Sequence, residues 1–353
     1  FPHERMDLVD RVDYTSFRFS QGPSQNLTLL GLQAGFSDPA YAPVEAKIQV
    51  QVSNSQWTRI PSASADMVIS GYEIQGGRGE LEFAKDMRTD TYYVRGKNGT
   101  EGFLAITLHA HAKMSYFDQY VPETLVGPLP TLRAVRTVSP LVADLLPHMG
   151  IDLGRMNYRE AVMKLLYFFS NWHLKSYPKR VAEATVDWAR HGLGHHDFQN
   201  FTQADFNALS PREKFVVAIL LECGVCRQRA EAFLMVARAL ELPVRLVYND
   251  IHAFVEIKLD REWKMFDLGG GGDPRQMALT DRESLETPKN SNVERGDVYR
   301  ENQRKYDEAM KKARQSKKGP KKDRSKRPGP ADRSPAPPRP GEPEGEDQGP
   351  PDK

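Results

Sequence analysis

The sequence contains very little cysteine, two residues in a chain of 353. This number excludes a disulfide-stapled scaffold. Long apolar runs are missing too, since none approaches the ~18 residues that a membrane-spanning helix needs. The densest run, Phe215 to Leu221, is predicted to be a core helix. The chain begins with Phe1 and shows no signal peptide, so we expect a processed protein or a piece of a longer one. We therefore expect an extracytoplasmic location (periplasm, cell envelope or secreted), with the cytoplasm as the alternative.

The C-terminal stretch lacks core-forming residues. Residues 301–353 contain no Leu, Ile, Val, Phe or Trp but 10 of the 25 prolines. They hold 15 basic and 10 acidic residues, which leaves 34 and 37 for the first 300 residues. Such a segment buries too little apolar surface to offset its ordering entropy. Residues 291–353 are therefore predicted to be a helical or disordered tail rich in Lys and Pro.

The basic part of this tail, Lys311 to Lys326, has no aromatic residue that could stack on bases. Specific binding to nucleic acid is therefore not expected. An anionic polymer or a membrane surface is a candidate partner, and simple solvation of the tail is the default.

Residues 1–120 are predicted to be mainly strands. Apolar and polar residues alternate along two runs, which is typical of half-buried antiparallel strands. The inward-facing sets are Ile48, Val50 and Val52 in one run, and Leu104, Ile106, Leu108 and Ala110 in the other. Turn clusters rich in glycine separate the runs. We therefore expect an all-β, sandwich-like domain over residues 1–120.

Residues 121–135 are rich in proline and are predicted to be a linker, because proline at this density prevents a helix and stiffens the chain. Helical spacing follows. Ser139-Pro140 predicts one helix start. From Tyr158 apolar residues recur at every third or fourth position. Ser210-Pro211-Arg212-Glu213 is a capping box that predicts a helix through about Glu222.

The second domain, residues 136–290, is predicted to end in a helix followed by three strands. The helix begins at Cys226 and is stopped by Pro243. Strands are expected at 244–248, 251–259 and 263–268, with a hairpin-length connection between the last two. Helices followed by a small antiparallel sheet make this domain α+β. The predicted fold class is thus α+β: a sandwich-like domain, an α+β domain and a tail.

Three residues of this domain are candidates for catalysis. Cys226 lies at a helix N-terminus, where partial positive charge and free N–H groups favour a thiolate. His252 and Asp267 lie on two paired strands, where paired positions sum to 521 or 519 depending on the turn. In the first register the two residues are diagonal, and in the second they are directly opposite. Either register places His252 and Asp267 on one face of the sheet, and the helix that begins at Cys226 is expected to cover that face. A carboxylate beside an imidazole stabilises the charged form of the imidazole.

Four segments together resemble the core of the transglutaminase-like superfamily. They are Gly224-Val225-Cys226-Arg227, Ala239-Leu240-Glu241-Leu242-Pro243-Val244-Arg245, His252-Ala253-Phe254-Val255-Glu256 and Trp263-Lys264-Met265-Phe266-Asp267. The resemblance spans about residues 140–275. It implies a papain-like core with a catalytic triad in which Cys226 is the nucleophile, followed by His252 and Asp267. Two features depart from the family pattern: Cys223 before the nucleophile, and the glycines at 269–272.

The resemblance implies thiol-dependent acyl transfer or amide hydrolysis. His252 would take the thiol proton, Cys226 would attack a carboxamide carbon, and a thioester would remain. The N–H of Cys226 is expected to be one oxyanion donor. An amine acceptor gives acyl transfer, water gives hydrolysis, and the expected substrate is a protein or peptide. Because the superfamily has members without activity, a catalytically silent scaffold or binding module is the alternative.

Cys223 and Cys226 also form a CxxC motif, which is typical of thioredoxin-like redox sites at helix N-termini. Such a motif usually follows a strand, whereas a capped helix precedes this one. A redox-regulated protein, including a regulatory disulfide between the two cysteines, is therefore a further alternative.

No cofactor and no metal site are expected. His109 and His111 share a strand face, and His195-His196 lies in a loop, but each pair offers two ligands where a zinc site needs three or four. The glycines at 269–272 lack the Lys-Ser/Thr of a phosphate loop, so we expect a flexible loop beside the active site. The sequence sets no oligomeric state.

Overall fold

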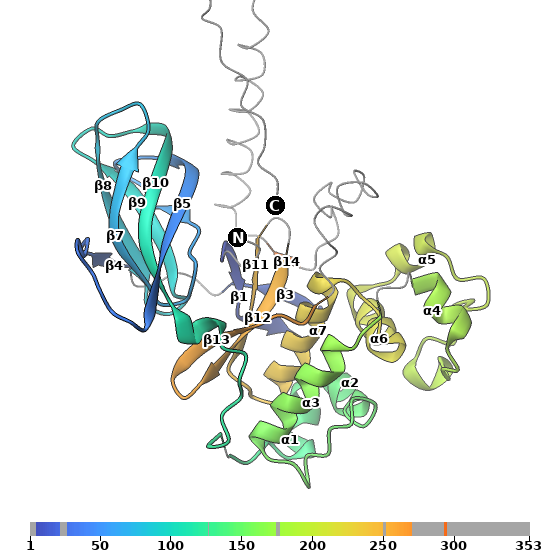
Figure 1. The fold of residues 1–353 in the computed structure, drawn as a ribbon. Helices are drawn as coiled ribbons and strands as arrows, with labels where there is room; N and C mark the ends of the chain where they lie inside the picture. Colours follow the sequence, from blue (N-terminus) through green and yellow to red (C-terminus); the bar gives the residue numbers. More distant parts are fainter. Residues whose placement is uncertain are drawn as a thin grey trace, which may run out of the picture. The chain divides into compact units, whose positions relative to one another are not determined.

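The computed structural model describes residues 5–21, 27–125, 127–173, 177–249, 252–269 and 293–294 (Figure 1). The chain divides into two compact units, Phe1–Asp297 and Val298–Lys353, and the second lies outside the described residues. Helices contain 28% of the described residues and strands 33%, which confirms the predicted α+β class. The predicted tail also lies outside the described residues, apart from the strand β14 (Val293–Glu294), and so do the glycines at 270–272. No described helix is long and apolar enough to cross a membrane.

The first part of the chain consists mainly of strands, as predicted. Their bounds are β1 Asp7–Val9, β2 Arg11–Asp13, β3 Arg18–Ser20, β4 Leu27–Leu30, β5 Tyr41–Val52, β6 Thr58–Ile60, β7 Met67–Ile74, β8 Glu80–Asp86, β9 Thr91–Lys97 and β10 Gly102–Lys113, followed by the 3-10 helix η1 Met114–Phe117.

Two of the sheets form the sandwich. Their strand orders are β5-β10-β7 and β4-β8-β9-β6, and they share one buried core. The alternation read from the sequence is confirmed, because Val50 of β5 and Ile106 and Leu108 of β10 are buried in that core together with Phe83 and Tyr92 of the other sheet. The predicted sandwich-like arrangement therefore lies within residues 27–113.

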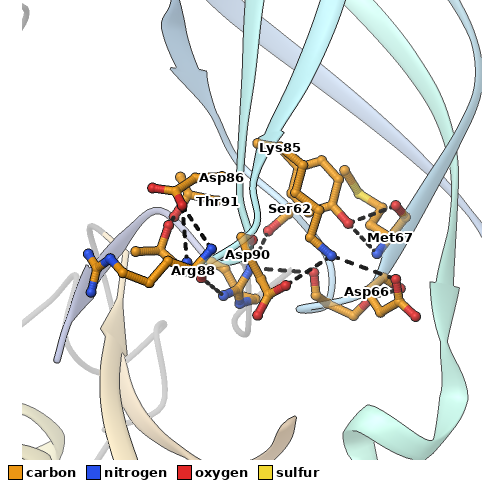
Figure 2. A network of polar contacts seen from close by, with 12 residues as sticks. Ser62, Asp66, Met67, Lys85, Asp86, Arg88, Asp90 and Thr91 are labelled. Atoms are coloured by element: carbon orange, nitrogen blue, oxygen red, sulfur yellow. Dashed lines mark hydrogen bonds and ion pairs between the residues drawn. The ribbon is translucent and has the colours of Figure 1, made fainter. Parts of the chain in front are cut away.

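A polar network fixes residues at one end of the sandwich (Figure 2). Nζ of Lys85 lies 3.0 Å from a carboxylate oxygen of Asp90 and 3.7 Å from one of Asp66. The hydroxyl of Tyr92 accepts from the N–H of Met67 at 2.6 Å and donates to the carbonyl of the same residue at 2.7 Å. This network positions Asp90, which also contacts the second part of the chain.

The second part of the chain begins with helices. Their bounds are α1 Leu132–Val138, α2 Pro140–Leu145, α3 Tyr158–Ser170, α4 Tyr177–Glu183, the 3-10 helix η2 Ala189–His191, α5 Gln203–Ala208, α6 Pro211–Leu221 and α7 Cys226–Ala239. Ser139 caps α2 and Ser210 caps α6, the latter in a capping box with Glu213. The starts predicted for these helices, for α3 and for α7 are confirmed.

The predicted linker, residues 121–135, differs from the structure. Val121 is buried in the helical core, and α1 begins at Leu132 with Thr131 as its N-cap. Pro128 forms a bridge with Asn157, the N-cap of α3. Proline is excluded from the interior of a helix but not from the residues before its cap, so a helix can begin directly after this stretch.

The sheet of the second part contains β11 (Val244–Tyr248), β12 (Ala253–Leu259) and β13 (Glu262–Phe266), and it gains an edge strand from the start of the chain. In β1, Asp7 pairs with Tyr248 and Val9 with Leu246. Phe17 and Phe19 are buried in the helical core as well. The prediction that residues 1–120 form one β domain thus differs from the structure at its start. A three-residue strand is too short to show a period.

The two faces of this sheet meet different neighbours. Odd-numbered residues of β12, such as Val255, pack with α7 in the helical core. Even-numbered residues face a smaller cluster, in which Phe254 packs with Leu8 of β1 and Tyr116 of η1. The sheet therefore lies between α7 on one side and the segment that leaves the sandwich on the other.

A buried ion cluster lies on the second face. Glu256 is fully buried and pairs with Arg5 at 2.5 Å and with Arg245. The hydroxyl of Tyr116 donates to Glu256 at 2.6 Å, and Arg245 also reaches Asp90 at 3.2 Å. Arg5 and Arg245 together hold the pKa of the Glu256 carboxyl at about 2 despite its burial. This cluster links β12 to the N-terminal segment and to the end of the sandwich.

Candidate active site

Cys226 is the first residue of α7, and the local sequence explains why the helix begins there. Val225 is the N-cap with an extended backbone, and its N–H donates to Oε1 of Gln228 at 3.0 Å. Gly224 is needed because a Cβ there would lie 2.9 Å from Cβ of Gln228 and 3.3 Å from the ring of Trp172. The N–H of Cys226 is in the first turn and has no acceptor within the helix.

His252 and Asp267 lie at the same end of the sheet, one just before β12 and the other just after β13. Nε2 of His252 is 3.2 Å from Oδ1 of Asp267. Paired positions of β12 and β13 sum to 521, so the two residues are diagonal, as one of the two predicted registers requires. The turn residues Asp260 and Arg261 have φ of 48° and 70°, as in a type I′ turn.

Both residues are held by contacts outside the ladder. The N–H of His252 donates to Oδ1 of Asn249 at 2.9 Å, and its carbonyl accepts from the N–H of Asn249 at 3.0 Å. The N–H of Gly269 donates to Oδ1 of Asp267 at 2.8 Å. Because Nε2 of His252 faces Asp267, Nδ1 is the ring nitrogen left to face the thiol of Cys226.

The three residues meet at the end of the sheet rather than on one face. The expectation that α7 covers the face shared by His252 and Asp267 is wrong, because α7 packs against the odd-numbered face of β12, through Val255. His252 and Asp267 lie outside the ladder, where the pleat of the strands no longer sets the direction of a side chain. Both can therefore approach the N-terminus of α7. Their side chains are 8% and 28% exposed, and Cys226 is 7% exposed.

The electrostatics of the set favour a charged pair. Burial by itself would raise the pKa of the Cys226 thiol. A hydrogen bond with His252, the charge of that ring and the N–H groups of Ala253 and Arg227 outweigh burial and lower the pKa. Burial would likewise lower the pKa of His252, but hydrogen bonds with Asp267 and Cys226 raise it to about 9. Both shifts favour the pair of a thiolate and an imidazolium over the neutral pair.

The comparison with protein families agrees with this geometry. The family model described as the transglutaminase-like superfamily matches residues 175–268, which include all three residues of the set. We call residues 175–268 the transglutaminase-like segment. At family level the fold is that of a cysteine enzyme.

Solved structures and curated proteins were compared as well. The periplasmic domain of TgpA from Pseudomonas aeruginosa bound to ethylmercury is 15% identical, with a TM-score of 0.36 over 78% of this chain and 86% of that one. A second structure of that domain, also 15% identical, has a TM-score of 0.32 over 75% and 81%. A candidate cysteine protease from Cytophaga hutchinsonii is 15% identical, with a TM-score of 0.29 over 65% and 78%. No curated protein matches the chain.

The transglutaminase-like segment contains a buried arginine that sequence reasoning missed. Arg229 is 3% exposed, and its guanidinium donates to the backbone carbonyls of Gly224 at 2.9 Å, Trp172 at 2.6 Å and Leu268 at 2.8 Å. Gly224 precedes the nucleophile and Leu268 follows Asp267, so one side chain ties together both sides of the site. The sequence signal is the position of Arg229 on the buried face of α7, where an apolar residue is expected.

Trp172, which follows the end of α3, was predicted only as part of an apolar stripe. Its indole Nε1 is buried and has no hydrogen-bond partner among the described residues. Its ring lies beside Gly224 and packs against Phe169, with ring centroids 4.9 Å apart. The edge that faces Gly224 is the carbon edge of the ring, Cε3 and Cζ3, so Trp172 packs against the loop to Cys226 and fixes its path.

Cys223 differs from Cys226 in its surroundings. It is 1% exposed in the helical core, and burial raises the pKa of its thiol to about 11. The two cysteines are not joined by a disulfide. A thiol with a raised pKa is a poor nucleophile at neutral pH, so the geometry favours Cys226 alone over a CxxC redox pair.

Proposed function

We propose that this protein is a thiol-dependent acyltransferase or amidase that acts on carboxamide or peptide groups of proteins through a thioester at Cys226. His252 acts as base and then acid, and Asp267 orients its ring. The observation that carries the proposal is the charged pair: the pKa of Cys226 is lowered and that of His252 is raised by their mutual contact beside Asp267.

The reaction follows from this arrangement. The sulfur of Cys226 attacks the carbonyl carbon of a carboxamide, and the carbonyl oxygen becomes an oxyanion. As the C–N bond breaks, the imidazolium of His252 gives its proton to the leaving nitrogen, which departs as ammonia or an amine. His252 then takes a proton from the acceptor, an amine or water, which attacks the thioester and releases Cys226.

One N–H donor for the oxyanion lies at the start of α7. It is the backbone N–H of Cys226, which begins this helix and has no acceptor within it.

The central test measures labelled-amine incorporation and ammonia release with a broad set of glutamine-containing proteins, in parallel with peptide-bond cleavage. Wild type is expected to show at least one of these activities, and Cys226→Ala none. Cys223→Ala is the matched control, because Cys223 lies in the core and is not part of the charged pair. If wild type shows none of the three activities, or if Cys226→Ala keeps them, the proposal fails.

The low exposure of Cys226 and His252 favours the second candidate, a catalytically silent binding module. Alkylation separates the two. An activated Cys226 should react with iodoacetamide well below the ordinary thiol pKa of about 8.5. Reaction that follows an ordinary thiol titration, or no reaction in the folded protein, would favour the silent module.

The extracytoplasmic location belongs to this proposal, with the cytoplasm as its alternative. A thiol reagent that does not cross membranes should label Cys226 in intact cells if the protein is exported. Labelling that occurs only after lysis would place the protein in the cytoplasm.

A further inference from the structure

A second group of ionisable side chains lies away from the triad residues. His195 and His196 follow η2 in a loop, and Glu213 lies in the first turn of α6. Nε2 of His195 is 3.3 Å from Oε1 of Glu213, and Nε2 of His196 is 3.0 Å from the same oxygen. Side chains of adjacent residues in a loop usually diverge, but these two rings lie 4.0 Å apart and direct the same ring nitrogen to one oxygen atom.

The fold holds two of these groups in place. The second carboxylate oxygen of Glu213, Oε2, accepts the N–H of Ser210 at 2.8 Å within the capping box of α6. This contact fixes the carboxylate and leaves Oε1 facing the histidines. The ring of His196 packs edge-on against Phe198, and Phe198 stacks on Trp188 with centroids 3.9 Å apart.

We propose that His195, His196 and Glu213 form a binding site for a divalent transition metal, with Zn²⁺ as the expected ion. Two imidazoles and one carboxylate are a donor set that zinc uses, with metal–ligand bonds of about 2.0–2.2 Å. Ligand atoms at those bond lengths around a tetrahedral ion are about 3.3 Å apart. The two N–O separations of 3.3 and 3.0 Å already have this spacing. Water completes the coordination, because His195 is 62% exposed.

The sequence pairs His195 with His196, and the carboxylate of the adjacent Asp197 is turned to Gln199 and Asn200 instead. Glu213 is contributed by α6 and reaches the pair because the loop folds back onto the start of that helix. A bound ion would therefore clip the segment between η2 and α5 to the N-terminus of α6. The expected consequence is higher stability of this part of the fold, separate from the chemistry at Cys226.

The test uses the full chain without an affinity tag, in a Cys226→Ala background so that the thiolate site does not compete for metal. The protein is treated with a chelator, dialysed against Zn²⁺ and analysed for bound metal, and Co²⁺ is used in parallel for its visible absorption bands. About one equivalent is expected per chain. His195→Ala/His196→Ala should lose that equivalent and the zinc-dependent rise in melting temperature.

Two further variants make the result specific. Glu213→Gln keeps a capping-box side chain, so α6 should still form, but it removes the charged ligand and should weaken Zn²⁺ binding about tenfold or more. The control is His109→Ala/His111→Ala, since His109 lies near Glu73 and His111 packs on Phe36 in the sandwich. It should bind zinc like the parent. The proposal is overturned if the parent binds no zinc at micromolar concentrations, or if the His195/His196 variant binds as much as the control.

Discussion

The start and the middle of β12 carry charged groups of opposite character. At the start, His252 contacts Cys226 and Asp267, and the pKa of the thiol is lowered while that of the imidazole is raised. In the middle, four residues further on, Glu256 is fixed as a carboxylate between Arg5 and Arg245, with a pKa of about 2. One strand thus supports a proton that can move and a charge that stays in place.

His252 and Glu256 differ because only Glu256 lies within the paired part of β12, the ladder that it forms with β11 and β13. Glu256 is inside it and fully buried, so its hydrogen-bonding partners surround it and its charge has no alternative state near neutral pH. His252 and Asp267 are just outside it, His252 buried and Asp267 partly exposed, and Nε2 of His252 lies 3.2 Å from Oδ1 of Asp267. The comparison separates catalysis from stability, and variants at each position should affect one and spare the other.

Cys226→Ala is expected to have the largest effect. Removal of the nucleophile should lower kcat/KM about 10⁴-fold or more, because binding and oxyanion donors alone supply only the remainder. The free energy of unfolding, measured by urea denaturation, should change little, since Cys226 and Ala are both small. Residual activity near that of wild type would show that Cys226 is not the nucleophile.

Glu256→Gln should do the opposite. It leaves two buried arginines without their carboxylate, so the free energy of unfolding should fall by about 3–5 kcal/mol. The matched control is Glu82→Gln, which breaks a partly exposed pair with Arg95 and should cost about 1 kcal/mol or less. If both variants unfold at the same urea concentration, the buried pairs of Glu256 contribute no more to the free energy of unfolding than the partly exposed pair of Glu82 does.

The acid stability of the protein should depend on the same residue. Because the pKa of Glu256 is about 2 in the fold and about 4.5 as its ordinary value, its contribution is complete above pH 4.5 and is lost as the pH falls towards 2. Urea midpoints measured across this range should fall more steeply for wild type than for Glu256→Gln. Parallel curves would contradict the assignment.

Asp267→Asn should act on the movable proton. The carboxylate raises the pKa of His252, so its loss should shift the alkaline limb of activity from about pH 9 to lower pH and reduce kcat/KM about 10³-fold. The sign follows from the imidazolium, which is present below its pKa and lost as the pH rises through it. The pH profile of kcat/KM provides the measurement. An unchanged alkaline limb would show that Asp267 does not set this pKa.

Arg229→Lys should give the smallest effect. A lysine ammonium cannot span the carbonyls of Gly224, Trp172 and Leu268 as the planar guanidinium does. The two sides of the site should drift apart, with kcat reduced about tenfold and KM nearly unchanged. Arg238→Lys, at the other end of α7, is the control and should leave both constants as they are.

The sequence is informative where a pattern is local. The capping box at Ser210, the start of α7 at Cys226 and the short turn after β12 each depend on a few neighbouring residues, and each was predicted. Parity alone predicted that His252 and Asp267 are neighbours, either diagonal or directly opposite. It did not predict the face that α7 covers, because parity ends where the ladder ends.

Contacts between segments that are distant in the sequence could not be predicted from it. Nothing near Arg229 shows that its acceptors are carbonyls from three separate segments, and nothing near His195 points to Glu213. The pairing of β1 with β11 joins residues more than 200 positions apart, and a three-residue strand has no period to detect. In each case the partner is chosen by the tertiary fold rather than by local propensity.

The pairing of β1 with β11 also imposes an order on synthesis. Asp7 is made well before its partner Tyr248, which emerges only after the sandwich and the described helices. At about 5–20 residues per second, β1 waits roughly 10–50 s for its place in the sheet. The sandwich can close during that interval, whereas the sheet that carries His252 and Asp267 becomes complete only when two segments more than 200 positions apart meet.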